Sequence, residues 1–250
     1  MTLNRFFLVF FISFSINLFA KGMPKEYYLI ENNEKSRIYF FEYIYNMTEN
    51  QNNKILEERT FIKKILSSNL LNINTKSEEF KKLLEIKKKY RIKKLYNITS
   101  YMKKIDIIPP SMSLAQAAIE SGWGKSRFIQ KANNIFGHWT YNPKIGILPE
   151  QRNDEDKHFI RIFKTLEDSI TAYMLNLNRN RAYKSFQEKR YKMRIENKHL
   201  NGLELSQTMI NYSGIGEEYL SILEIVIRKN KLEKYDKRFY NKNMYKQNIK

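Results

Sequence analysis

The residue best placed to do chemistry in this sequence is Glu120, which ends the segment Leu114–Glu120 and precedes Ser-Gly-Trp-Gly. Three alanines in that segment favour a helix, and Gly122 and Gly124 favour its termination. A carboxylate at a helix C-terminus faces the carbonyl end of the helix dipole, and burial beneath Trp123 would disfavour its charged form further. Both effects raise the pKa of the group, and a carboxyl group that stays protonated near neutral pH can act as a general acid.

Capping and breaking residues indicate how Glu120 is positioned. A Pro-Pro pair breaks the preceding segment, and Ser111 or Ser113 can cap the helix that follows. Gln116 lies one helical turn before Glu120 and therefore shares its face. We expect the helix to present both polar side chains on one side.

The elements after this helix are predicted from the same kinds of signal. The segment 138–163 holds turn-forming Pro and Gly residues and ends in an alternating run typical of a strand, so it predicts a small β lobe. A helix should start at Thr165, where Asp168 completes a capping box. Further helices are expected over about 203–212 and around Tyr219.

A longer ordered pattern extends from Glu120 through the C-terminal half of the chain. Its matching pieces are Pro110-Ser111, Leu114-Ala115-Gln116-Ala117-Ala118, Glu120-Ser121-Gly122-Trp123-Gly124, Ser126, Asn133-Asn134-Ile135-Phe136-Gly137, Ala172-Tyr173, Asn176-Leu177-Asn178, Ala182-Tyr183, Tyr212-Ser213, Gly216 and Tyr219. The pattern resembles the glucosaminidase family of bacterial peptidoglycan hydrolases, found in autolysins and flagellar wall hydrolases. The Bax-type subgroup is the nearest, over roughly residues 24–235.

The resemblance implies a fold, a reaction and site residues. The fold is mainly α (α+β) and lysozyme-like, with a small β lobe beside a sugar-binding cleft. The reaction is hydrolysis of the β-1,4 bond after N-acetylglucosamine in the glycan strands of peptidoglycan. Glu120 would be the catalytic acid, and Tyr212, with Tyr219 less securely, would line the cleft.

Hydrolysis also needs a second group that activates water or stabilises the oxocarbenium ion. Either a second carboxylate or the acetamido group of the substrate can do this. Relatives in the subgroup often place a Glu after the histidine equivalent to His158, and this chain has Phe159 there. Among the carboxylates of the expected β lobe we choose Glu155, and the alternative is a polar turn without a chemical role.

Two aromatic residues follow the Asn-Ile-Phe-Gly turn, at Trp139 and Tyr141. Aromatic faces pack well on the flat C–H faces of sugars, so both are candidates for a saccharide platform. Core packing is the alternative for each. Trp123 is interpreted as structural.

The N-terminal residues 1–20 resemble a signal peptide, with Arg5 before a short apolar run that ends at Ala20. An uncleaved membrane anchor is the alternative, and both predict a periplasmic or secreted protein. We divide the remainder into a helical N-terminal region over 21–105, the glucosaminidase domain over 106–235 and a basic, loosely ordered C-terminal tail over 236–250.

Composition narrows the partners and cofactors. The 45 basic and 26 acidic side chains give a net charge of +19, which suits an anionic wall or membrane surface, although an AT-rich coding sequence would also enrich lysine. The export signal disfavours nucleic acid as a partner. Zero cysteines exclude disulfides and cysteine nucleophiles, and the isolated histidines and missing phosphate-binding loops indicate neither a metal site nor a cofactor.

Two other functions remain open on the same scaffold. A lytic transglycosylase shares the fold and the single acid but closes an anhydro ring, and it typically carries Gly-Leu-Met-Gln where this chain has Asn133–Gly137. A non-catalytic wall-binding protein is disfavoured by the intact motif around Glu120. The aromatic residue at Phe159 keeps it open.

Overall fold

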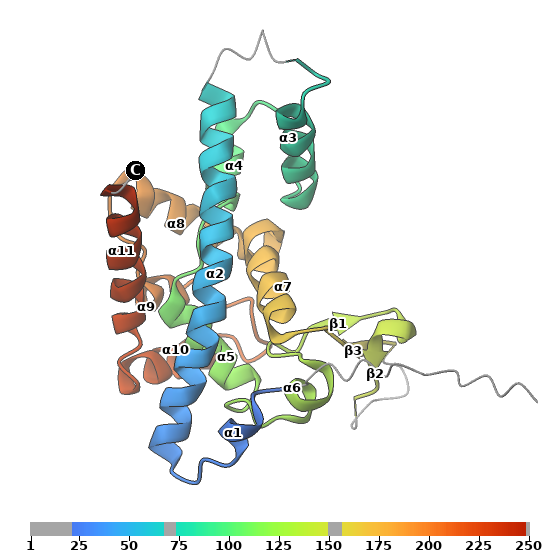
Figure 1. Cartoon of the computed structure of the whole chain (residues 1–250), viewed down its shortest axis with the longest axis vertical. Helices are drawn as coiled ribbons and strands as arrows, with labels where there is room; N and C mark the ends of the chain where they lie inside the picture. Colours follow the sequence, from blue (N-terminus) through green and yellow to red (C-terminus); the bar gives the residue numbers. More distant parts are fainter. Residues whose placement is uncertain (1–21, 68–73, 150–156, 249–250) are drawn as a thin grey trace, which may run out of the picture.

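The computed structural model describes residues 22–67, 74–149 and 157–248, which fold into a mainly helical protein with a small antiparallel sheet (Figure 1). The helices are α1 Lys25–Tyr28, α2 Asn33–Ser67, α3 Glu78–Lys89, α4 Ile98–Lys104, α5 Pro110–Glu120, α6 Arg127–Ala132, α7 Leu166–Arg179, α8 Lys184–Ile195, α9 Gly202–Ser206, α10 Glu217–Lys229 and α11 Glu233–Asn248. The strands are β1 Trp139–Thr140, β2 Gly146–Ile147 and β3 Phe159–Arg161, and the short 3-10 turns are η2 Pro143–Ile145 and η3 Arg181–Tyr183. The predicted fold class is confirmed.

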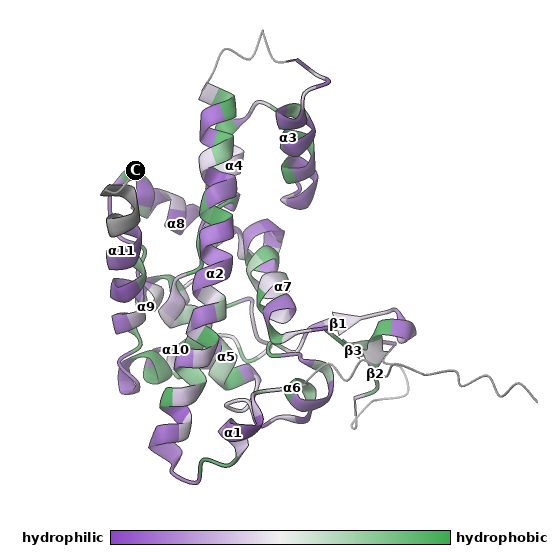
Figure 2. Cartoon of the chain, viewed as in Figure 1, coloured by the Kyte–Doolittle hydropathy of each residue, from purple (hydrophilic) through white to green (hydrophobic). Residues whose placement is uncertain are grey.

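Helix α2 is the longest element, at 35 residues, and runs past most of the molecule (Figure 1). Its inner residues Phe40, Ile44 and Ile62 are fully buried in the same hydrophobic core as Leu114 and Ala117 of α5. Figure 2 shows mixed hydropathy along α2 and a mostly hydrophilic α3. The N-terminal region 21–105 and the domain that follows it therefore share one hydrophobic core across the expected boundary.

A buried ionic cluster fixes the connection between α4 and α5. Arg194 of α8 makes two hydrogen bonds of 3.0 and 2.9 Å to the fully buried carboxylate of Asp106. Arg190, also fully buried, donates to four backbone carbonyls between Lys103 and Ile107. The arginines hold the pKa of Asp106 below its usual range against the effect of burial. Because removing one partner would leave an uncompensated buried charge, the cluster holds the segment 103–107 before α5 against α8.

Helix α5 starts differently from the prediction. Pro110 occupies its first turn, the N-cap is Pro109, and no side chain caps it. Proline suits this position because its missing N–H would have had no partner within the helix. Ser111 is instead buried and donates its hydroxyl to Asp236 of α11 at 2.6 Å.

The expectation of a loosely ordered tail over 236–250 is wrong. Residues up to Asn248 belong to α11, which packs along the molecule beside α5, with Phe239 1% exposed. Asp236 and Phe239 are three positions apart and so share the buried face. The predicted boundary at 235/236 thus falls within a helix that is part of the core.

The predicted β lobe is confirmed, with strand order β1-β3-β2 and both pairs antiparallel. Trp139 pairs with Ile160, and Ile147 pairs with Ile160 from the other side. The lobe projects from the helices beside the start of α7, whose capping box between Thr165 and Asp168 is present as predicted (Figure 1). The helix expected over 203–212 is shorter and ends at Ser206.

No helix among the described residues is long and apolar enough to cross a membrane. The segment 1–20, interpreted above as a signal peptide or anchor, lies outside those residues.

Candidate active site

Glu120 is the last residue of α5 and is partly buried. Its Oε1 accepts a 2.7 Å hydrogen bond from the hydroxyl of Tyr219 on α10. The hydroxyl oxygen of Tyr219 in turn accepts from Nε2 of Gln116 at 3.2 Å, and Oε1 of Gln116 accepts from the hydroxyl of Tyr173 on α7 at 2.6 Å. A continuous chain of hydrogen bonds therefore runs from α7 through α5 and α10 to the carboxylate.

Tyr212 joins this group through its ring. The ring stacks on Tyr219 at a centroid distance of 5.5 Å and an interplanar angle of 11°. It also contacts the rings of Tyr173 at 6.4 Å and Tyr183 at 6.0 Å. The two predicted tyrosines, Tyr212 and Tyr219, thus lie together with Glu120.

The electrostatics of the group favour a protonated acid. Burial raises the pKa of Glu120 above its ordinary value, and the hydrogen bond from Tyr219 opposes this increase. The position at the carbonyl end of α5 also disfavours a negative charge. Burial and the neighbouring carboxylate raise the pKa values of Tyr212 and Tyr219 well above the usual range, so both keep their hydroxyl protons.

The turn after Glu120 has an unusual backbone. Gly122, Trp123 and Gly124 all have positive φ angles, of 54°, 57° and 77°. Glycine adopts this conformation freely, but a tryptophan in it is strained unless its surroundings hold it there. The predicted termination of the helix by the two glycines is confirmed.

The N-terminal helix α1 holds this turn. The hydroxyl of Tyr27 donates to the carbonyl of Trp123, and that of Tyr28 donates to the carbonyl of Gly124 at 3.1 Å. The ring of Trp123 packs edge-on against Phe41 of α2 at 5.3 Å. Trp123 is therefore structural, and the residues near the start of the described chain help to place Glu120.

The aromatic residues predicted as a platform form a separate group on the β lobe. Trp139 is 62% exposed and stacks on the ring of His158 at 4.0 Å, and Tyr141 is 76% exposed. Both side chains are open to solvent, so core packing does not account for either one. Glu155 lies outside the described residues, and its role stays a prediction.

Two members of the hydrogen-bonded chain were not predicted as site residues. Gln116 could have been found, because its position four residues before Glu120 places it on the same helical face. Tyr173 occupies a regular apolar position of α7 and is buried against the ring of Phe136 at 3.9 Å. Its spacing indicates a core residue, and nothing in the sequence reveals that its hydroxyl reaches Gln116.

Comparison with known proteins gives two matches. The Glucosaminidase family, described as mannosyl-glycoprotein endo-beta-N-acetylglucosaminidase, matches residues 95–242. Protein bax of Escherichia coli (strain K12) is 30% identical over 129 residues, which are 52% of this chain and 45% of that protein. The match thus spans less than half the length of this relative. No solved structure matches the chain. Since the family match covers more than half of the sequence and includes the hydrogen-bonded group around Glu120, the chain belongs to the glucosaminidase family.

Proposed function

We propose that this protein is an exported peptidoglycan hydrolase that cleaves the β-1,4 bond after N-acetylglucosamine, with Glu120 as the general acid. The observation that carries the proposal is the setting of this carboxyl group. It lies at the end of α5, burial raises its pKa, and its hydrogen bond within the described residues is the one from Tyr219. An acid with one oxygen held and a raised pKa suits protonation of a glycosidic oxygen.

The hydrogen-bond directions support one position for the proton of the proposed acid. Because the amide nitrogen of Gln116 donates to the Tyr219 oxygen, the Tyr219 proton points toward Oε1 of Glu120. The amide orientation is fixed in turn by Tyr173, which donates to the Gln116 oxygen. Oε1 is thus occupied as an acceptor, and Oε2 is the oxygen that carries the proton to the leaving group.

The second half of the reaction needs a group that activates water or stabilises the sugar cation. The acetamido group of the substrate and the predicted carboxylate Glu155 are both candidates. The chain has Phe159 where relatives often carry a glutamate, so either the earlier carboxylate Glu155, which we choose, or the substrate group takes this part. The stacked Trp139 and His158, with Tyr141, would support the sugar ring on the β lobe.

Export forms part of the proposal. Residues 1–20 would direct the chain to the periplasm or the outside of the cell, whether they are removed or kept as an anchor. The net charge of +19 would favour an anionic wall or membrane surface over free solution.

The test is to incubate the purified chain with peptidoglycan and identify the new chain ends by mass spectrometry, with Glu120→Gln in parallel. We expect new reducing N-acetylglucosamine ends with the native chain and none with the variant. Anhydro-muramic ends would identify a lytic transglycosylase instead. Binding without cleavage by the native chain would indicate a non-catalytic wall-binding protein.

A further inference from the structure

A pocket of about 910 Å³ lies between the β lobe and one face of α7. Its floor on the helix side comes from Ala172, Leu175 and Asn176. The opposite wall is formed by His138, by Lys144 and Ile145 of η2, and by the residues 161–164 at the end of β3 and after it. Its volume lies in the range that is common for small-molecule binding sites, roughly 300 to 1,000 Å³.

The charged side chains that line this pocket are almost all of one sign. Lys144, Arg161, Lys164 and Arg179 come from four different segments of the chain and contribute four positive charges. The carboxylate in the lining, Asp168, accepts the backbone N–H of Thr165 as part of the capping box. None of the four cations forms an ion pair within the residues that the structure describes.

Burial and the neighbouring positive charges act in the same direction on the pKa values of two residues that line the pocket. Burial and then the positive charges of Arg91 and Arg161 lower the pKa of Arg179. Burial and Arg161 lower the pKa of His138 to about 4, so this side chain is neutral at physiological pH. Like charges held together without a counter-charge cost free energy, which an anionic ligand would offset.

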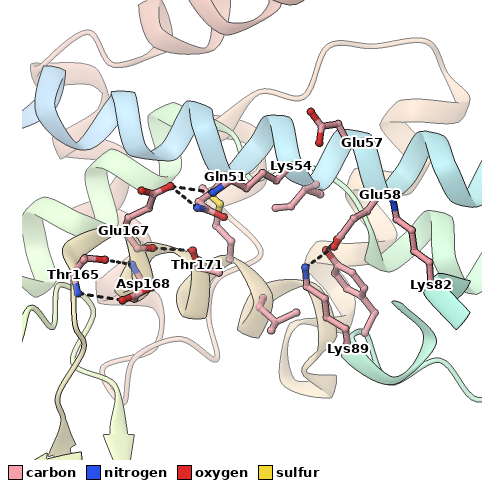
Figure 3. A pocket seen from close by; sticks show the side chains of 14 residues that line it. Gln51, Lys54, Glu57, Glu58, Lys82, Lys89, Thr165, Glu167, Asp168 and Thr171 are labelled. Atoms are coloured by element: carbon pink, nitrogen blue, oxygen red, sulfur yellow. Dashed lines mark hydrogen bonds and ion pairs between the residues drawn. The ribbon is translucent and has the colours of Figure 1, made fainter. Parts of the chain in front are cut away.

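A second pocket serves as a contrast. The pocket of about 560 Å³ between α2, α3 and α7 is also lined by charged residues (Figure 3). There Lys89 pairs with Glu58 at 2.7 Å, and Glu167 accepts from Gln51 at 2.7 Å and from Lys54 at 3.3 Å. Its charges are largely paired with each other, whereas among the described residues the four cations of the β-lobe pocket have no ion-pair partner.

The β-lobe pocket adjoins the candidate active site through two contacts. Burial raises the pKa of the Tyr183 hydroxyl, a hydrogen bond with Asn176 of the pocket wall opposes this increase, and the charge of Glu120 adds to it. His138 packs edge-on against Phe136, which stacks on Tyr173 of the hydrogen-bonded chain. A ligand group in the pocket would therefore lie beside a glycan bound at Glu120.

We propose that this pocket is a subsite for the carboxylates of the peptide stems that peptidoglycan carries on its glycan strands. Arg161 and Arg179 provide planar donor groups suited to carboxylates, and Lys144 and Lys164 add positive charge at the rim. The subsite makes the protein selective for glycan that still bears its peptides. This inference rests on the proposed function, because it assigns part of the same substrate to a second surface.

The experiment compares two substrates and two variants. The substrates are peptidoglycan with intact stems and the same strands after enzymatic removal of the stems. The test variant is Arg161→Gln with Arg179→Gln, and the control is Lys88→Gln with Lys229→Gln, which removes the same charge from exposed positions elsewhere. We expect the test variant to lose roughly tenfold in kcat/KM on intact strands, through KM, and to match the native chain on stripped strands. The control should match the native chain on both.

A binding measurement tests the subsite independently of whether the protein cleaves peptidoglycan. In this measurement each charge variant also carries Glu120→Gln, and retention on insoluble peptidoglycan is measured at low and high salt. Retention of the test variant should fall only on stem-bearing material, and its salt dependence should be weaker. An equal loss on stripped and intact strands, or no loss on either, would overturn the subsite. If the native chain cuts no peptidoglycan but binding shows the expected pattern, only the proposed function has failed.

Discussion

A carboxyl group lies at each end of helix α5, the buried Asp236 at one end and the partly buried Glu120 at the other, and the two groups have very different partners. At the N-terminal end, Asp236 of α11 accepts from the backbone N–H and hydroxyl of Ser111 at 2.8 and 2.6 Å and from the N–H of Gly202 at 3.0 Å. At the C-terminal end, Glu120 accepts one hydrogen bond within the part of the chain that the structure describes, from Tyr219. The carboxylate of Asp236 links α11 to α5 and to α9. In Glu120 only Oε1 accepts a hydrogen bond from a described residue, so Oε2 is available to a substrate.

Burial acts in the same direction on both groups. It raises the pKa of Asp236 to about 6 despite three donors, and it raises that of Glu120 with one donor opposing it. A shifted pKa therefore does not by itself distinguish an acid that catalyses from one that holds the fold. The number of hydrogen-bond donors distinguishes the two groups. Both oxygens of Asp236 accept hydrogen bonds from the protein, so neither is readily available to a substrate.

The strongest test of this difference is to replace each of the two carboxyl groups by its amide in a separate variant. Glu120→Gln should lower kcat by about 10³-fold, because general acid catalysis typically contributes 10² to 10⁴. Asp236→Asn should lower the free energy of unfolding by about 2 to 4 kcal/mol, because in either orientation its NH2 group would face one backbone N–H, of Ser111 or of Gly202, and leave that donor without an acceptor. Turnover of peptidoglycan and denaturant unfolding measure the two effects.

Each variant is the control for the other. Glu120→Gln should leave the free energy of unfolding within about 1 kcal/mol of the native chain. The replaced carboxylate accepts one hydrogen bond from a described residue, Tyr219, and the amide oxygen of glutamine can accept the same bond. The folded fraction of Asp236→Asn should keep most of its activity. A large stability loss in the first variant, or inactive folded protein in the second, would contradict the division of roles.

The pH dependence of stability should follow Asp236. Its pKa is 3.8 in an ordinary environment and about 6 in the folded chain, so the folded state binds this proton more tightly. The contribution to stability is therefore present below pH 4 and is lost as the pH rises through 6, on the order of 2 to 3 kcal/mol. Unfolding free energies of the native chain and Asp236→Asn between pH 4 and 7 check this, and parallel curves would refute it.

A smaller effect is expected from removing the single donor to Glu120. Tyr219→Phe takes away the hydrogen bond that stabilises the carboxylate, so the pKa of Glu120 should rise. Activity requires the protonated acid, and its loss on the alkaline side should therefore move to higher pH while kcat falls about tenfold. The pH profile of kcat is the measurement. An unchanged alkaline limit would mean that another group sets it.

The weakest effect in this series concerns the support of the turn after Glu120. Tyr27→Phe removes the hydroxyl that donates to the carbonyl of Trp123. We expect kcat to fall about threefold with KM unchanged, and stability to fall by about 1 kcal/mol, the net value of one hydrogen bond. Tyr96→Phe, at a residue 58% exposed, is the matched control. Equal effects of both variants on kcat would show that Tyr27 does not position the acid.

Much of the fold was predictable because its signals are local. The helix before Glu120 follows from its alanines, the capping box from Thr165 and Asp168, and the β lobe from its turn residues, although the predicted serine cap of the helix is absent. The hydroxyl of Tyr173 could not be assigned to the site, because its contact with Gln116 joins residues 57 positions apart. The polar tail after residue 235 suggested disorder, because a single buried carboxylate and Phe239 cannot outweigh its many charges in a composition-based argument.

The contact between α1 and the turn after Glu120 also bears on how such a chain can evolve. A unit with its own core and exposed boundaries can be moved between proteins by recombination. Here Met23 and Phe40 approach Gly124 so closely that an added Cβ would lie 3.0 and 3.2 Å from their side chains. The segment matched by the family, 95–242, lacks both of these partners and the two tyrosines of α1. A gene fusion that kept only the matched segment would therefore retain Glu120 but lose the contacts from the N-terminal region that hold the turn after it.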